Sequence, residues 1–125
     1  MRELQTTSNA SWLGPLYGRD KYSVIAASKL LVFPTRRDEF PMTLIEATIL
    51  GCVPLVSPVG SVGEIVRDGF NGVTIDPEDV DGIVRRIREL GRGEDLGRMS
   101  ANGIEFARTH FTSEAVREQI LGIVG

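Results

Sequence analysis

The stretch Pro34-Thr-Arg-Arg-Asp38-Glu39-Phe40-Pro41-Met42-Thr43-Leu-Ile-Glu46-Ala47 joins an apolar run at residues 30–33 to an apolar helical pattern. Two acids, Asp38 and Glu46, flank this junction with seven residues between them. In an open α/β sheet such a junction lies at the carboxyl edge of a strand, where ligands bind. Backbone N–H groups at a helix start favour anions, and carboxylates accept hydrogen bonds from hydroxyls. The stretch therefore predicts a site for a ligand with both phosphate and hydroxyl groups.

Short apolar runs alternate with helical patterns along the rest of the chain. We expect strands at residues 11–13, 30–33, 53–56 and 72–75. We expect helices at residues 21–28, 42–50, a short one from 61, and at 76–90, 96–108 and 113–123. The run at 30–33 has no polar alternation, which is typical of a strand covered on both faces. This order predicts an α/β fold, with a Rossmann-like parallel sheet and covering helices.

Single residues sharpen several of these boundaries. Pro54 fits only the start of a strand or an edge strand, because it has no N–H to donate. Ser61 and Glu64 have the spacing of a capping box, so Glu64 is expected to cap a helix rather than bind a ligand. Asp76 and Pro77 predict a helix that starts there, with Asp76 as the cap and Pro77 in the first turn.

Composition excludes several classes of function. The chain of 125 residues is expected to form one domain, 1–125, and its net charge of −3 provides no basic field for nucleic acid. The only cysteine, Cys52, excludes an internal disulfide and is expected to be buried, and His110 is expected to be structural. Neither a Gly-x-Gly-x-x-Gly turn nor a P-loop is present, and we expect no cofactor and no metal. Arg85, Arg86 and Arg88 share a helix with acids, which favours a solvated face.

Several segments, taken together, resemble the donor-binding C-terminal domain of family 4 retaining glycosyltransferases, which have the GT-B fold and are also called glycosyl transferases group 1. The resemblance covers roughly residues 11–123 and is specific because the motifs occur in order and at the right spacings. The matching segments are residues 30–34, 38–47, Gly51, Val53, Pro54, Gly60, 64–66, Asp68, Gly69, Asn71 and Gly72.

The resemblance implies roles for the residues of the opening stretch. Asp38 takes the position of the acid that binds donor-sugar hydroxyls, and Glu46 that of the acid that binds the ribose hydroxyls of the nucleotide. Backbone amides between these acids contact the diphosphate and sugar, which assigns donor binding to Glu39, Phe40, Pro41, Met42 and Thr43. The substrate is thus expected to be a nucleotide-diphosphate sugar, used by a hexosyltransferase in, for example, polysaccharide biosynthesis.

Alternatives to these roles stay open. Asp38 stands where the family has glutamate, and Glu39 stands where it has glycine, so Glu39 is an alternative sugar-binding acid. Thr43 and Glu46 also have the spacing of a capping box, in which Glu46 only anchors its own helix. At the level of function, the alternatives are a non-catalytic nucleotide-sugar-binding fragment and a GT-B nucleotide-sugar epimerase.

The resemblance also implies missing parts. The family has an N-terminal acceptor domain and two further β-α units before the Trp12 strand, whose arginine and lysine neutralise the diphosphate. We therefore expect this chain alone to be inactive. Without those units the strand at 30–33 has an open edge, which predicts either pairing with the Trp12 strand or self-association. No signal or membrane-spanning segment is apparent, so we expect a cytoplasmic protein, whose full-length form can also lie at the inner membrane face.

Overall fold

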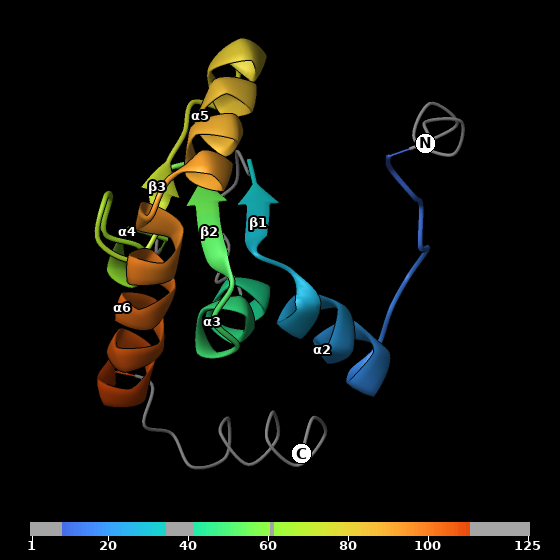
Figure 1. Ribbon diagram of the computed structural model, residues 1–125. Coiled ribbons are helices and arrows are strands. Elements are labelled where there is room, and N and C mark those ends of the chain that lie inside the picture. The colour runs from blue at the N-terminus through green and yellow to red at the C-terminus, as the bar shows by residue number, and fades with distance from the viewer. Residues whose placement is uncertain (1–8, 35–41, 61, 111–125) are drawn as a thin grey trace.

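The computed structural model describes residues 9–34, 42–60 and 62–110, and its elements carry the labels of Figure 1. Strands and helices alternate as the sequence predicts, so the expected α/β class is confirmed. The elements are α2 (Gly18–Ala27), β1 (Leu30–Phe33), α3 (Met42–Ile49), β2 (Val53–Val56), α4 (Val62–Ile65), β3 (Val73–Thr74), α5 (Val80–Arg92) and α6 (Asp95–His110).

The three strands form a parallel sheet in the order β1-β2-β3. Leu30 of β1 is in register with Val53 of β2, and Leu55 of β2 with Val73 of β3. Proline is tolerated in this central strand because Pro54 lies at its start. The N–H of Val53 donates to a carbonyl on the β1 side, so the nitrogen of Pro54 faces the β3 side, where pairing begins only at Leu55.

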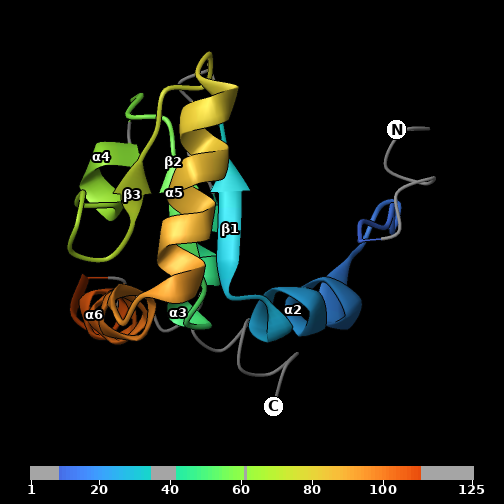
Figure 2. The same ribbon diagram turned by 45° about the horizontal axis from the view of Figure 1, so that its top comes forward.

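Each face of the sheet has its own apolar cluster, because side chains alternate between the two faces of a strand. On one face, Val56 packs with Leu44 and Ile45 of α3 and with residues of α4. On the other face, Leu55 packs with Leu90 of α5 and with other residues of α5 and α6. Figure 2 shows α5 lying over the sheet. All four residues of β2 are buried, so this strand belongs to both clusters.

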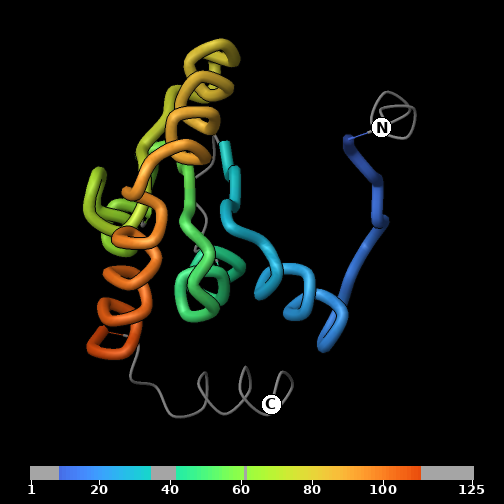
Figure 3. The backbone as a smooth tube through the Cα atoms, in the orientation of Figure 1, coloured from blue at the N-terminus to red at the C-terminus, as the bar shows by residue number. Residues whose placement is uncertain are grey.

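The strand expected at residues 11–13 is absent, and the prediction was wrong. Residues 9–17 form no strand, and Trp12 is 48% exposed. Figure 3 shows this segment running away from the sheet before it enters α2. A strand needs a neighbour for its backbone groups, and no strand in the described part of the chain lies beside it. Pairing between this segment and β1 is therefore excluded in this structure.

The strand β1 is an edge strand and is less covered than the sequence predicts. Its residues are half-buried, apart from Val32, which is 40% exposed. Within the described ranges β1 pairs only with β2, so one row of its backbone groups has no ladder partner there. The apolar run predicted a strand covered on both faces. Leu31 and Phe33 pack against one cluster and Leu30 against the other, but Val32 is exposed.

The helix after β3 begins at Val80, later than predicted. The carboxylate of Asp79 accepts a hydrogen bond from the N–H of Gly82 at 3.0 Å and is the N-cap. Asp76 instead accepts from the N–H of Glu78 at 2.9 Å, which makes a turn before the helix. Asp76 and Asp79 are both candidate N-caps, and Asp79 forms the cap. The helix expected at 113–123 and the Ser61 half of the capping box lie outside the described residues.

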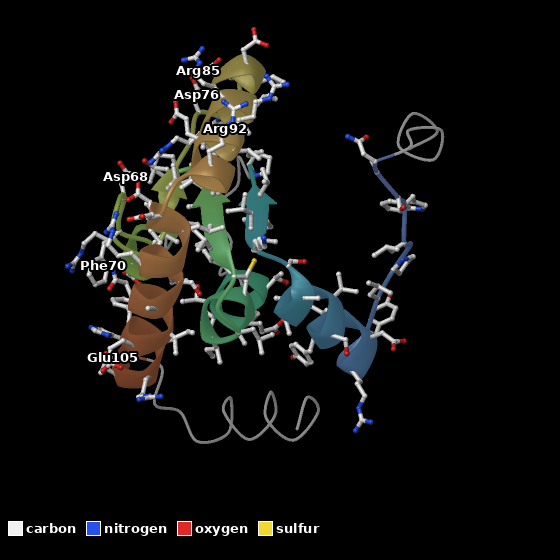
Figure 4. The ribbon with its side chains drawn as sticks, in the orientation of Figure 1. Asp68, Phe70, Asp76, Arg85, Arg92 and Glu105 are labelled. Atoms are coloured by element: carbon white, nitrogen blue, oxygen red, sulfur yellow. The ribbon has the colours of Figure 1, made fainter. Side chains whose placement is uncertain are left out.

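Helix α6 fixes the loops between the other elements. Ser100 Oγ donates to the Gly51 carbonyl at 2.6 Å, and Asn102 Nδ2 donates to the Phe70 carbonyl at 2.9 Å. Figure 4 shows Phe70 on this side of the molecule, beside α6. Within the same loop, buried Asn71 donates to the Ile65 carbonyl and accepts from the N–H of Arg67. The side chain of Asn71 therefore has a structural role, because it holds this loop together. Among the helices that the structure describes, none is long and apolar enough to cross a bilayer.

Candidate functional site

The start of α3 confirms the predicted start of a helix at residue 42. The helix begins at Met42, whose side chain is 41% exposed, and Thr43 follows half-buried. The first N–H groups of an α-helix have no acceptor within the helix, so this end is suited to an anion. Four predicted site residues, Asp38, Glu39, Phe40 and Pro41, lie outside the described residues, as do Arg36 and Arg37.

Glu46 of α3 is buried, with its side chain only 7% exposed. Its neighbour is Lys21 of α2, whose Nζ lies 2.9 Å from Glu46 Oε2. Although this distance is that of an ion pair, Oε2 has no partner in hydrogen-bonding geometry. We therefore treat the contact as ionic. The lysine side chain is 31% exposed, whereas the carboxylate side chain is buried.

Tyr22 completes a cluster of three side chains, Lys21, Tyr22 and Glu46, which we call the Glu46 cluster. Tyr22 is 5% exposed and is the buried residue of α2. Burial, the negative charge of Glu46 and a hydrogen bond with the Glu46 side chain raise the pKa of Tyr22 above its ordinary value, while Lys21 lowers it. The phenol is therefore held in its neutral, hydrogen-bonding form beside the carboxylate.

The structure excludes one alternative role for Glu46. A capping box would require Thr43 to be the N-cap of α3 and Glu46 to reach back to it. Thr43 instead lies inside α3, and the Glu46 side chain is directed to Lys21 and Tyr22 on another helix. A buried carboxylate that is turned away from its own helix start is free for a role other than capping.

The other candidates have structural surroundings. Burial raises the pKa of the Cys52 thiol to about 11, so it is a poor nucleophile, and its expected burial is confirmed. His110 stacks on Phe106 with ring centroids 4.0 Å apart at the end of α6, as expected for a structural residue. Glu64 is exposed in α4. Within the residues that the structure describes, no group of acids, histidines and cysteines could hold a metal ion.

Surface hollows occur elsewhere, along α5. The larger, of about 880 Å³, is lined by residues of the exposed face of α5, including Arg85, Arg88 and Arg92. Figure 4 shows Arg85 and Arg92 on this outer helix. On the same helix Arg86 pairs with Glu89 at 3.1 Å, which agrees with the predicted solvated face. A smaller hollow of about 250 Å³ is lined by Asp68, Asp76 and Asp79 among others, and its acids disfavour phosphate.

Lys21 and Tyr22 are the site residues that sequence reasoning missed. Periodicity predicts a helix here and places Tyr22 on its apolar face, but it contains no signal for a contact with Glu46. Such a contact depends on how α2 packs on α3, and no local pattern encodes that arrangement.

These features coincide with a known family. The family model described as "Glycosyl transferases group 1" matches residues 1–109, and the chain belongs to this family. It is 31% identical, over 74% of its length, to an uncharacterized glycosyltransferase of Methanocaldococcus jannaschii. It is 30% identical, over 86% of its length, to the D-inositol 3-phosphate glycosyltransferase of a Mycobacterium species.

A solved structure confirms the GT-B type of fold. The HepE protein of Anabaena, crystallised in complex with UDP-glucose, has a TM-score of 0.79 and 20% identity over 97% of this chain. This chain covers 33% of that protein, and 28% and 24% of the two curated relatives. The chain therefore spans about a quarter to a third of the length of these proteins.

The Glu46 cluster can be tested through Tyr22. Because its pKa is raised in the folded chain, the neutral phenol contributes stability below its ordinary pKa of 10.0, and this stability is lost as pH rises through the folded pKa. We expect Glu46→Gln to lower the pKa of Tyr22, because it removes a negative charge and keeps the shape of the side chain.

The measurement is an alkaline titration of the tyrosinate absorbance in a Tyr17→Phe background. Tyr17 is 79% exposed, so its removal isolates Tyr22 without disturbing the core. An unchanged Tyr22 titration in Glu46→Gln would show that the two side chains do not interact.

Proposed function

We propose that this chain is the nucleotide-sugar-binding part of a retaining glycosyltransferase, with residues 1–125 forming a single, truncated domain. The observation that carries the proposal is the buried Glu46 carboxylate on α3, the helix whose start offers unpaired N–H groups. The two carboxylate oxygens of Glu46 can accept hydrogen bonds from the vicinal hydroxyls of a ribose. Such charge-assisted hydrogen bonds are stronger than those between neutral groups. The helix start suits the diphosphate of the same ligand.

The remaining roles follow the family motif. Glu46 binds ribose, and the backbone N–H groups of Phe40, Met42 and Thr43 contact the diphosphate and sugar, while Pro41, which has no N–H, lines the site. Asp38 or its neighbour Glu39 binds hydroxyls of the transferred sugar, which we take to be a hexose. The HepE protein was crystallised with UDP-glucose, which supports a uridine nucleotide as the first ligand to test.

A second candidate is a binding fragment without catalysis, which the partial coverage of the relatives favours. A diphosphate leaving group needs cationic stabilisation in the transition state. Among the described residues, Lys21 is the cation found at Glu46, and it is already paired. We therefore propose that the chain binds donor but does not transfer sugar by itself, and that the complete protein acts in the cytoplasm in polysaccharide biosynthesis.

The edge of β1 is the proposed contact for a further strand of the sheet. Val32 is 40% exposed on a strand that pairs only with β2 within the described ranges, and open edges recruit other strands. In a full-length protein a strand from an N-terminal segment would occupy this edge. That segment would connect to the acceptor domain. In the isolated chain a second copy can occupy it instead.

Binding of nucleotides tests the proposed function. We expect isothermal titration calorimetry to detect UDP or another nucleoside diphosphate, and Glu46→Gln to weaken it about tenfold or more, because charge-assisted hydrogen bonds contribute about 1.5–3 kcal/mol. Glu105→Gln is the matched control, since Glu105 is an exposed acid on α6, as Figure 4 shows. Absence of binding for UDP, GDP, ADP and their sugars, or equal affinity in Glu46→Gln, would refute the assignment.

Light scattering after size-exclusion chromatography tests the open edge. We expect the molar mass to rise with protein concentration, and Val32→Lys to restore a monomer, because a lysine on an edge strand opposes pairing. Val80→Lys is the control, since Val80 is 65% exposed on α5, away from the edge. A wild-type chain that stays monomeric at every concentration would eliminate self-association.

A further inference from the structure

The structure shows which side chain lies at the carboxylate that the proposed function assigns to ribose. Lys21 Nζ lies 2.9 Å from Glu46 Oε2, and that oxygen is buried without a partner in hydrogen-bonding geometry. A hydroxyl that is to donate to Oε2 must therefore take the place of the ammonium. The short distance and the poor hydrogen-bonding geometry together describe a counter-ion that covers the oxygen rather than a fixed structural bond.

The helix that carries Lys21 is lightly attached. Among the residues of α2, Tyr22 is the buried one, and the N-cap residue Tyr17 makes no side-chain capping hydrogen bond. Figure 1 shows α2 at the β1 side of the molecule, with the N-terminal segment leading into it. The Lys21 side chain is 31% exposed, so its ammonium can move into water without uncovering the core.

We propose that Lys21 occupies the ribose-binding position of Glu46 in the free chain and is displaced when a ribonucleotide binds, so that it limits how much the ribose hydroxyls add to the affinity. This inference rests on the proposed function. A carboxylate has about four acceptor positions. Lys21 and Tyr22 cover some of them, and the vicinal diol takes the position that the ammonium leaves. A ligand without both hydroxyls leaves the ion pair in place, so its affinity does not depend on Lys21.

The exchange of Lys21 for a ribose diol predicts the direction in which the loss of Lys21 changes the binding affinity. In the free state the ion pair compensates for burying the Glu46 charge, so breaking the pair costs free energy that the ligand must supply. If Lys21 is replaced by an apolar residue, this cost disappears and the carboxylate keeps Tyr22 as its partner. Binding of a diol should then become tighter. A residue that merely held Glu46 in position would give the opposite sign, because its removal would weaken binding.

The test compares UDP with 2′,3′-dideoxy-UDP in calorimetric titrations of the wild-type chain and of Lys21→Met. Methionine keeps the length of the side chain over Tyr22 and removes the charge. We expect Lys21→Met to bind UDP about fivefold more tightly, as for a partly exposed ion pair, and to bind dideoxy-UDP as the wild type does. Lys29→Met, at an exposed lysine, should leave both affinities unchanged.

Weaker or equal UDP binding in Lys21→Met would overturn the inference. Lys21→Arg retains the cation and should restore the wild-type ratio of UDP to dideoxy-UDP affinity. Thermal melting identifies a variant that does not fold, and in that event Lys21→Gln, which keeps N–H donors without a charge, is expected to show a smaller rise in UDP affinity. If the wild type itself binds UDP and dideoxy-UDP equally, the ribose assignment of Glu46 fails. If the wild type discriminates but no Lys21 variant alters the ratio, only the exchange fails.

Discussion

A carboxylate is buried in the middle of a mostly apolar helix, and its contacts with Lys21 and Tyr22 join α2 to that helix. Glu46 is 5% exposed between Ile45 and Ala47, which belong to the core. Burying such a charge is costly unless a cation and hydrogen-bond donors accompany it. Lys21 and Tyr22 supply both from α2, so the same contact satisfies the charge and attaches α2 to α3. An acid with only a packing function would be better replaced by an apolar residue.

The sequence predicted most of the fold because the strongest patterns are local. The strands β1 and β2 have the predicted limits, and the starts of α3 and α6 differ from prediction by at most one residue. The strand at Trp12 was wrongly predicted, since a short apolar run is a strand only if a neighbouring strand pairs with it. The start of α5 was misplaced because Asp76 and Asp79 both resemble caps, and the structure uses Asp79.

The site was predictable in part, and for a physical reason. Glu46 and the helix start at Met42 were found because their spacing along the chain is itself the motif. Lys21 and Tyr22 were not, because they reach Glu46 only through the packing of α2 on α3. The roles of Asp38 and Glu39 stay predictions. The ribose half of the proposed site thus has structural support in the described residues, and the sugar half depends on the family motif.

Chemical-shift mapping with UDP on the 15N-labelled chain would show where a nucleotide binds. If Glu46 and the helix start form the site, the largest shifts belong to the amides of Met42, Thr43 and Lys21, with a further change at Tyr22. Shifts confined to the α5 hollow around Arg85 and Arg92 would contradict the site, as would a spectrum that UDP leaves unchanged.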